Sequence, residues 1–291
     1  MRARFAALAG ALLVALLAAG ARAGAGTPQY VAVVAGLNNV DPGSYAGWDG
    51  HLNAALNDAN DMAALLGKQR FTVTSLLGPD ASRGNVLGEI RKARELEPGS
   101  MLVVFFSGHG ARVPDSSEPN GAGSAWCLYD GELLGRDLGV EWTMVPAGVR
   151  IVVVLDSCFS GGGITVAPTG KPIKEIPPDV QARVLQGAAW AKGIVSFQTP
   201  TANPPATKAA VILLSACGAS ETTAEGLRNG VFTEKLLEVW NNGAFPGTYQ
   251  VFREEIQRAL RNGRPPWTQS PVLVPVGSAG GSLKGARPFT P

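Results

Sequence analysis

The chain has 291 residues, 45% of them hydrophobic and 16% charged, with a formal net charge of +2. This length is enough for one large α/β domain, or for one domain with an appendage. The small net charge argues against nucleic acid or an acidic surface as the partner.

Residues 1–23 have the three-part layout of a secretory signal peptide. Arg2 and Arg4 precede an apolar run, and Ala21-Arg22-Ala23 offers small residues for a cut after Ala23. The alternative is an uncleaved anchor, but the run is shorter than the roughly 20 residues of a membrane-spanning helix. We therefore expect export to the periplasm or the extracellular space, with no stable membrane span after signal removal.

Strand and helix patterns alternate along the rest of the chain. The predicted strands are Tyr30–Gly36, Phe71–Leu77, Met101–Phe106, Ser124–Asp130, Val149–Leu155, Ala209–Leu214 and Pro271–Val276. The predicted helices are Asn53–Leu66, Ser82–Leu96 with Ser82 as N-cap, Phe232–Trp240 and Tyr249–Leu260. Alternation of this kind, with strands apolar on both faces, predicts an α/β fold with a mostly parallel sheet covered on both sides.

Two segments lack the hydrophobic periodicity of a helix or a strand. Residues 161–207 are rich in Gly, Pro, Thr and Ala, and we predict a flexible insert there. Residues 277–291 are rich in Gly, Ser and Pro, and we predict a disordered tail. The folded domain is then expected to span residues 28–276.

The three cysteines are an odd number, so in an exported chain at least one thiol stays free or pairs with another chain, or all three stay free. A cysteine near the end of a buried strand is usually a small core residue, and this is what we expect of Cys127 and Cys217. Cys158 differs, because polar and Gly residues surround it in Asp156-Ser157-Cys158-Phe159-Ser160-Gly161. Catalysis is one reason for an exported protein to keep a free thiol.

His109 and Cys158 each follow a predicted buried strand. Because the carboxyl ends of parallel strands meet at one edge of a sheet, these side chains are expected to come together there. A nearby imidazole lowers the pKa of a thiol and holds the thiolate, the form that attacks carbonyl carbons. The backbone N–H groups of Gly110 and Cys158 are candidates for stabilising the oxyanion that follows. The other histidine, His51, fits a surface or capping position.

Ser107-Gly108-His109-Gly110, followed by Asp156-Ser157-Cys158 about fifty residues later, resembles the catalytic pair of caspase-like peptidases. Two further segments resemble metacaspases and their bacterial relatives, the orthocaspases: Leu56–Met62 on the first helix, and Ser215–Thr233 at the start of the small-subunit region. The resemblance implies a three-layer αβα sandwich with a sheet of about six strands. It also implies a cysteine-type endopeptidase that works through a Cys–His dyad and an acyl-enzyme.

The animal caspase pattern Gln-Ala-Cys is replaced here by Asp-Ser-Cys. In metacaspases, the residues that match Asp58, Ser107 and Asp156 line the primary substrate pocket. Two buried carboxylates require a cation, so the resemblance implies cleavage after Arg or Lys, with Arg favoured by bidentate pairing. The alternatives are that Asp58 faces solvent on its helix and that Asp156 only stabilises the turn before Cys158.

Some metacaspases bind calcium through acidic residues after the strand that matches Ser124–Asp130. This sequence keeps Asp130, Glu132 and Asp137, but Leu138 stands where a second adjacent Asp is expected. That departure argues against calcium dependence, and we predict no metal site and no cofactor.

The insert at 161–207 lies where caspase-like chains are often cut. Lys174, Arg183 and Lys192 are candidate points of self-cleavage, and a plain solvated loop is the alternative. The expected partner is a peptide or protein with Arg or Lys before the cut, and a monomer is expected over a dimer. Two other functions stay open: an idle caspase-like module that binds or regulates in the cell envelope, and thiol chemistry of another kind, such as peptide ligation or an Asp/Asn-specific cut like that of legumain relatives.

Overall fold

The computed structural model describes residues 26–115, 122–158, 173–187, 207–218, 221–263 and 266–291. The predicted signal at 1–23 lies outside these residues, as does Lys192. Within the described part of the chain, no helix is long and apolar enough to cross a membrane.

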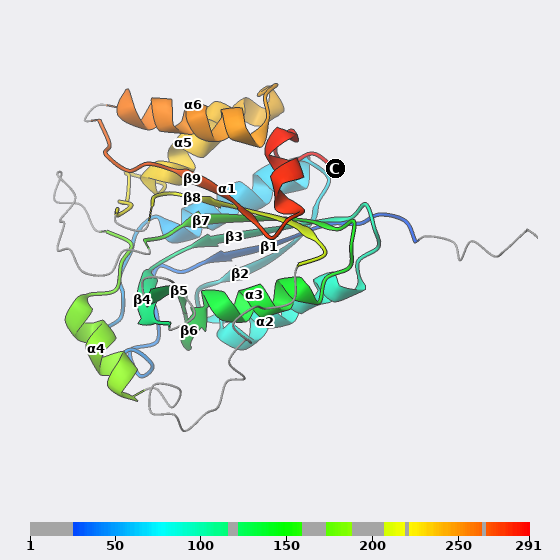
Figure 1. Ribbon diagram of the computed structural model, residues 1–291. Helices are drawn as coiled ribbons and strands as arrows, with labels where there is room; N and C mark the ends of the chain where they lie inside the picture. Colours follow the sequence, from blue (N-terminus) through cyan, green and yellow to red (C-terminus); the bar gives the residue numbers. More distant parts are fainter. Residues whose placement is uncertain (1–25, 116–121, 159–172, 188–206, 219–220, 264–265) are drawn as a thin grey trace, which may run out of the picture.

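A six-stranded sheet forms the centre of the molecule, with the strand order β2-β1-β3-β7-β8-β9 (Figure 1). Five strands run parallel, and the edge strand β9 is antiparallel to β8. The strands are β1 (Tyr30–Gly36), β2 (Thr72–Leu77), β3 (Met101–Ser107), β7 (Arg150–Asp156), β8 (Ala210–Ser215) and β9 (Val272–Val276). The predicted α/β class and mostly parallel sheet are confirmed.

The two strands that precede the candidate catalytic residues, β3 and β7, lie side by side in the middle of this sheet. All of β3 is buried, and all of β7 after Arg150 is buried as well. Strands covered on both faces consist of continuous β-branched and aromatic residues, which is why these runs were so apolar in the sequence. Their register pairs Ser107 with Asp156, so both strands end at the same level.

Helices cover both faces of the sheet, which gives the three layers visible in Figure 1. One face carries α1 (Ala55–Lys68), α5 (Val231–Trp240) and α6 (Tyr249–Arg261), and the other carries α2 (Arg83–Arg91) and α3 (Gly135–Thr143). Each face has its own hydrophobic core. The predicted N-cap is confirmed, since the Ser82 hydroxyl accepts a hydrogen bond of 3.2 Å from the N–H of Asn85.

A second, three-stranded antiparallel sheet lies beyond the end of β3. It consists of β4 (Gly110–Pro114), β5 (Ala122–Leu128) and β6 (Gly131–Leu134), and β4 begins directly after His109. The predicted strand Ser124–Asp130 corresponds to β5 and therefore belongs to this small sheet.

Two segments that we predicted to be flexible or disordered contain ordered structure, so these predictions were wrong. Part of the expected flexible insert is ordered, because residues 173–176 make strand-like contacts and α4 (Pro178–Gly187) follows them. The expected disordered tail contains a short 3-10 helix, Gly280–Gly285, and its Phe289 is fully buried. Both segments are ordered by contacts with distant parts of the chain, which a local sequence pattern does not reveal. The domain therefore includes residues 277–291.

We predict that Phe289→Ala destabilises the protein by about 3 to 5 kcal/mol, because it leaves a cavity among the aromatic rings of Trp240, Tyr249 and Phe252. Urea denaturation of the full chain measures the change. Leu227→Ala is the matched control, since Leu227 is 94% exposed and its loss should cost less than about 0.5 kcal/mol. A Phe289→Ala cost as small as that of the control would contradict the packing of the tail.

Candidate active site

The loops that carry His109 and Cys158 meet at the carboxyl edge of the sheet. Each residue stands two positions beyond the paired strand ends Ser107 and Asp156. The backbones touch so closely that a Cβ on Gly110 would lie 1.7 Å from the carbonyl oxygen of Cys158. Only glycine fits at position 110, and the predicted convergence of the two loops is confirmed.

The two predicted oxyanion donors point at one oxygen atom. The N–H of Gly110 and the N–H of Cys158 each donate a hydrogen bond of 3.0 Å to the carbonyl oxygen of Lys174. Two backbone donors on one carbonyl polarise its C=O bond and would stabilise negative charge that develops on the oxygen.

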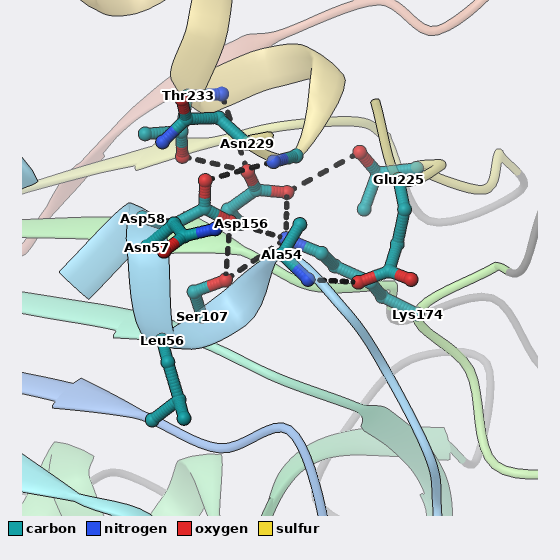
Figure 2. A network of polar contacts seen from close by, with 12 residues as sticks. Ala54, Leu56, Asn57, Asp58, Ser107, Asp156, Lys174, Glu225, Asn229 and Thr233 are labelled. Atoms are coloured by element: carbon teal, nitrogen blue, oxygen red, sulfur yellow. Dashed lines mark hydrogen bonds and ion pairs between the residues drawn. The ribbon is translucent and has the colours of Figure 1, made fainter. Parts of the chain in front are cut away.

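The side chain of the same Lys174 fills the predicted pocket (Figure 2). Its ammonium lies 2.8 Å from Oδ2 of Asp58, 2.8 Å from Oγ of Ser107 and 3.1 Å from Oδ1 of Asp156. An ammonium has three N–H donors, and each finds one acceptor here. All four side chains are fully buried, so the pocket is a sealed, matched set of charges.

The pocket carboxylates are fixed from behind by α5 and the residue before it. The N–H of Gly230 donates to Oδ1 of Asp58 at 2.8 Å, and the Thr233 hydroxyl donates to Oδ2 of Asp156 at 2.6 Å. A Cβ on Gly230 would lie 2.3 Å from Asp156 Oδ2 and 2.4 Å from Lys174 Nζ, so this position also requires glycine. Burial alone would lower the pKa of Lys174, but the charges of Asp156 and Asp58 outweigh it and raise that pKa above its ordinary value.

A buried carboxylate, Glu225, connects this region to the start of α1. It accepts hydrogen bonds from the N–H groups of Asn53 and Ala54, at 2.8 Å and 2.7 Å. Because the Ala54 side chain cannot cap the helix, Glu225 satisfies these free N–H groups and places negative charge at the positive end of the helix dipole. The contact also holds α1, and with it Asp58, against the loop that leads to Gly230.

His109 is buried, with its ring oriented by a backbone carbonyl. Its Nε2 lies 3.0 Å from the carbonyl oxygen of Gly50, and Trp48 packs edge-on against the ring. A carbonyl oxygen only accepts, so Nε2 carries the proton and Nδ1 keeps a free lone pair; Nδ1 has no hydrogen-bond partner among the described residues. Burial, with a smaller contribution from the charge of Lys174, lowers the pKa of His109 to about 4.

The Cys158 thiol is covered as well. Its side chain is fully buried, and its Sγ accepts a hydrogen bond of 2.9 Å from the N–H of Thr223. Burial raises the pKa of Cys158 above its ordinary value, and the neighbouring Cys217 adds to the shift. In this arrangement the thiol and the imidazole are both neutral near pH 7, so no thiolate is ready to attack.

The sequence anticipated the pocket residues Asp58, Ser107 and Asp156, and it named Lys174 only as a point of cleavage. It missed Gly50 and Thr223, and it named Glu225 only within the segment that resembles the small-subunit region, without a role. One signal in the sequence pointed to the part of the site that contains Thr223 and Glu225. It was the resemblance of Ser215–Thr233 to the start of the small-subunit region of metacaspases. Cys127 and Cys217 are buried, as predicted, and His51 is exposed.

Two of the three residues considered for calcium, Asp130 and Asp137, contact Arg83. The backbone N–H of Arg83 donates to Asp130 at 2.7 Å, and its guanidinium pairs with Asp137 at 3.2 Å. Among the residues that the structure describes, no group of three or more His, Cys, Asp or Glu side chains could hold a metal ion.

The lowered pKa of His109 predicts a pH-dependent stability. The folded value of about 4 lies below the ordinary 6.5, so the unfolded chain binds more protons between these values. The free energy of unfolding should therefore fall as the pH drops from about 6.5 towards 4, by about 2 to 3 kcal/mol from this group. Urea denaturation at pH 7.5 and 4.5 measures it, with His109→Asn as the comparison. If the free energy of unfolding had the same pH dependence in His109→Asn and in the unchanged protein, the imidazole would not be buried as described.

Comparisons with known proteins agree with this geometry. A family model described as the Caspase domain matches residues 31–275. Metacaspase-4 of Arabidopsis thaliana is 33% identical over 153 residues, which cover 47% of this chain and 34% of the relative, so the match spans about a third of that protein's length. Metacaspase-1 of Mycosarcoma maydis is 26% identical over 278 residues, which cover 79% of this chain and 67% of the relative.

Solved structures share the fold of this chain. A crystal structure of a Geobacter sulfurreducens protein superposes with a TM-score of 0.80 at 35% identity, over 90% of this chain and 99% of that one. Caspase-1 of Spodoptera frugiperda superposes with a TM-score of 0.53 at 12% identity, which shows a shared fold. Because the family model spans most of the chain, the protein is a member of the caspase domain family of cysteine peptidases.

Proposed function

We propose that this protein is a cysteine endopeptidase that hydrolyses peptide bonds after basic residues. One observation carries the proposal: a lysine of the chain itself lies in the acidic pocket, while its carbonyl oxygen accepts from both backbone donors beside Cys158. A lysine before a scissile bond would need both contacts at once.

In the proposed reaction, the Sγ of Cys158 attacks the substrate carbonyl carbon after its proton passes to Nδ1 of His109. The N–H groups of Gly110 and Cys158 stabilise the oxyanion. The imidazolium then gives its proton to the leaving amine, which leaves an acyl-enzyme, and water releases the acyl group. Gly50 keeps the ring in the tautomer that this transfer requires, because its carbonyl fixes the proton on Nε2.

The pocket supports specificity for a cation. Asp58 and Asp156 are both fully buried, and a neutral or acidic side chain would leave them without an opposite charge. Unpaired buried charge is costly, so the substrate cation is needed to complete the site. The three acceptor atoms match the three donors of a lysine ammonium.

The runner-up is an idle caspase-like module that binds without cutting. The pairing of a buried cation with two aligned oxyanion donors favours the enzyme, because binding alone has no use for donors beside a thiol. Ligation or an Asp/Asn-specific cut would use the same thiol, and the substrate panel below separates these reactions.

We expect incubated protein to hydrolyse fluorogenic peptides ending in Lys or Arg at least about 10³-fold better, in kcat/KM, than peptides ending in norleucine, Asn or Asp. Cys158→Ala should lower kcat/KM by at least about 10⁴-fold, because the nucleophile is lost. Each rate is measured with and without calcium. Equal rates for Cys158→Ala and the unchanged chain would refute the thiol mechanism, and faster cleavage after Asp or Asn would refute the basic pocket.

Removing the charge of one pocket carboxylate should lower the hydrolysis of Lys peptides, whereas removing a nearby carboxylate outside the pocket should not. Asp58→Asn is expected to lower kcat/KM for Lys peptides by about 30- to 100-fold, the loss of a charged hydrogen bond. Asp61→Asn is the matched control one turn along α1, where Asp61 pairs with the exposed Arg228; its kcat/KM should stay within about twofold. If both variants lost the same activity, the effect would belong to the helix and not to the pocket.

A further inference from the structure

We propose that Cys217 is a resolving thiol for Cys158, so that a peroxide joins the two sulfur atoms in a disulfide and inactivates the nucleophile reversibly. The inference rests on the proposed function, because it concerns the nucleophile of that reaction. It gives a chemical role to Cys217, which the sequence predicted only as a core residue.

Cys158 and Cys217 follow neighbouring strands of the central sheet. β7 and β8 are parallel, and their register pairs Leu155 with Ser215, so both strands end at the same level. The N–H of Ala216 donates to the carbonyl of Leu155 at 2.9 Å, which keeps the backbones paired up to the residue before Cys217. Neighbouring strands lie about 4.8 Å apart, and the Cα atoms of a disulfide are about 4.4 to 6.8 Å apart. The spacing of the two strands therefore suits a disulfide.

The two sulfur atoms contact the same short stretch of backbone. Sγ of Cys158 accepts a hydrogen bond of 2.9 Å from the N–H of Thr223, and Sγ of Cys217 donates to the carbonyl of Glu221 at 3.3 Å. A hydrogen bond also links the side chains of Cys158 and Cys217 to each other. The two thiols are therefore direct neighbours, and both are free in the structure.

The third cysteine, Cys127, belongs to a different part of the molecule. Its side chain lies in the hydrophobic cluster that contains Val180 of α4, where it forms a hydrogen bond with Tyr45. Cys127 is as deeply buried as Cys158, so it serves as the control for a buried cysteine in another cluster.

The proposed oxidation has two steps. After the thiol of Cys158 loses its proton, the thiolate attacks one oxygen of hydrogen peroxide, and the O–O bond breaks. The products are a sulfenic acid on Cys158 and a hydroxide, which takes up the lost proton as water. The thiol of Cys217 then attacks the oxidised sulfur, the S–O bond breaks, and a second water leaves as the S–S bond forms. Peroxide gains the two electrons that the thiols lose, and a dithiol returns them by exchange.

The packing makes the first step slow and the second step fast. The thiolate is the form that attacks, and burial raises the pKa of Cys158, so little thiolate is present near pH 7. The second step needs no encounter, because a reactant held in contact acts at a very high effective concentration. We therefore expect the disulfide to form before a second peroxide produces the sulfinic acid, which reductants do not reverse. Since Cys158 is fully buried and Cys217 is only 2% exposed, the oxidant has to be small.

A disulfide here would remove two features that the proposed reaction needs. Sγ of Cys158 would no longer attack a carbonyl carbon. It would also turn towards Cys217 and away from the N–H of Thr223. The carbonyl of Thr223 accepts from the N–H of Lys174 at 3.1 Å, so this loop also holds the main chain of the residue in the pocket.

The test follows the disulfide and the activity in the same samples of the full chain. Purified, reduced protein is treated with hydrogen peroxide. Peptide mapping without reductant and hydrolysis of a Lys peptide are then measured before and after dithiothreitol. We expect two peptides joined through Cys158 and Cys217, a chain lighter by two hydrogen atoms, and a loss of kcat/KM of at least about 10-fold. Dithiothreitol should restore at least about 80% of the starting kcat/KM, because it reduces disulfides.

Two variants make the test specific. Cys217→Ser lacks the resolving thiol, so the same treatment should make it heavier by two oxygen atoms, and dithiothreitol should restore less than about 20% of its own starting kcat/KM. Cys127→Ala is the control and should form the disulfide and recover as the unchanged chain does. If Cys217→Ser does not fold, as judged by its thermal transition, the peptide map of the unchanged chain still decides the outcome.

The proposal is overturned if the peptide map shows no bond between Cys158 and Cys217, if dithiothreitol does not restore the unchanged chain, or if Cys217→Ser recovers as fully as that chain. In each of these cases the endopeptidase function would stand. Failure of the function itself looks different, since the reduced protein would then hydrolyse no peptide, while the peptide map would still report the disulfide.

Discussion

The structure depends on one buried ion cluster, in which the ammonium of Lys174 lies between the carboxylates of Asp58 and Asp156. Each of these charges would be costly to bury alone, and removing one member of such a set typically destabilises a protein by about 3 to 5 kcal/mol. The cluster therefore links segments that are far apart in the chain: α1, the end of β7 and the segment that crosses the active site. Buried charges of opposite sign have to balance, which explains why the acidic pocket contains a lysine.

The rest of the site is arranged by the sheet. Because β3 and β7 are neighbours in register, the strand ends place Ser107 and Asp156 at the pocket and the candidate catalytic residues His109 and Cys158 two positions beyond them. Glycine at position 110 lets the two backbones touch, and glycine at position 230 leaves room for the cation. Under the proposed function, binding and chemistry therefore share one edge of the sheet, where the carbonyl oxygen of a residue held in the pocket meets the N–H groups of Gly110 and Cys158.

Much of this could be predicted from the sequence, because the strands and helices on which it depends have strong local patterns. β1 matches its predicted bounds, and the convergence of the loops that carry His109 and Cys158 followed from neighbouring strands that end in polar loops. Two carboxylates near one pocket also predicted a cation. The prediction failed where order comes from distant contacts: α4 and the tail around Phe289 lie in segments rich in Gly, Pro and small residues, and β4 and β6 of the small sheet have only five and four residues. The occupant of the pocket was hidden for the same reason, since Lys174 lies in a segment whose composition predicts only a loop.

The central claim, that the site holding Lys174 is where a substrate lysine binds, is tested most directly by a structure. The purified protein would be reacted with a peptide aldehyde ending in lysine and crystallised. The account predicts a bond from the aldehyde carbon to Sγ of Cys158, the inhibitor ammonium between Asp58 and Asp156, and its oxygen on the N–H groups of Gly110 and Cys158. An inhibitor side chain bound elsewhere, with Lys174 still in the pocket, would contradict it.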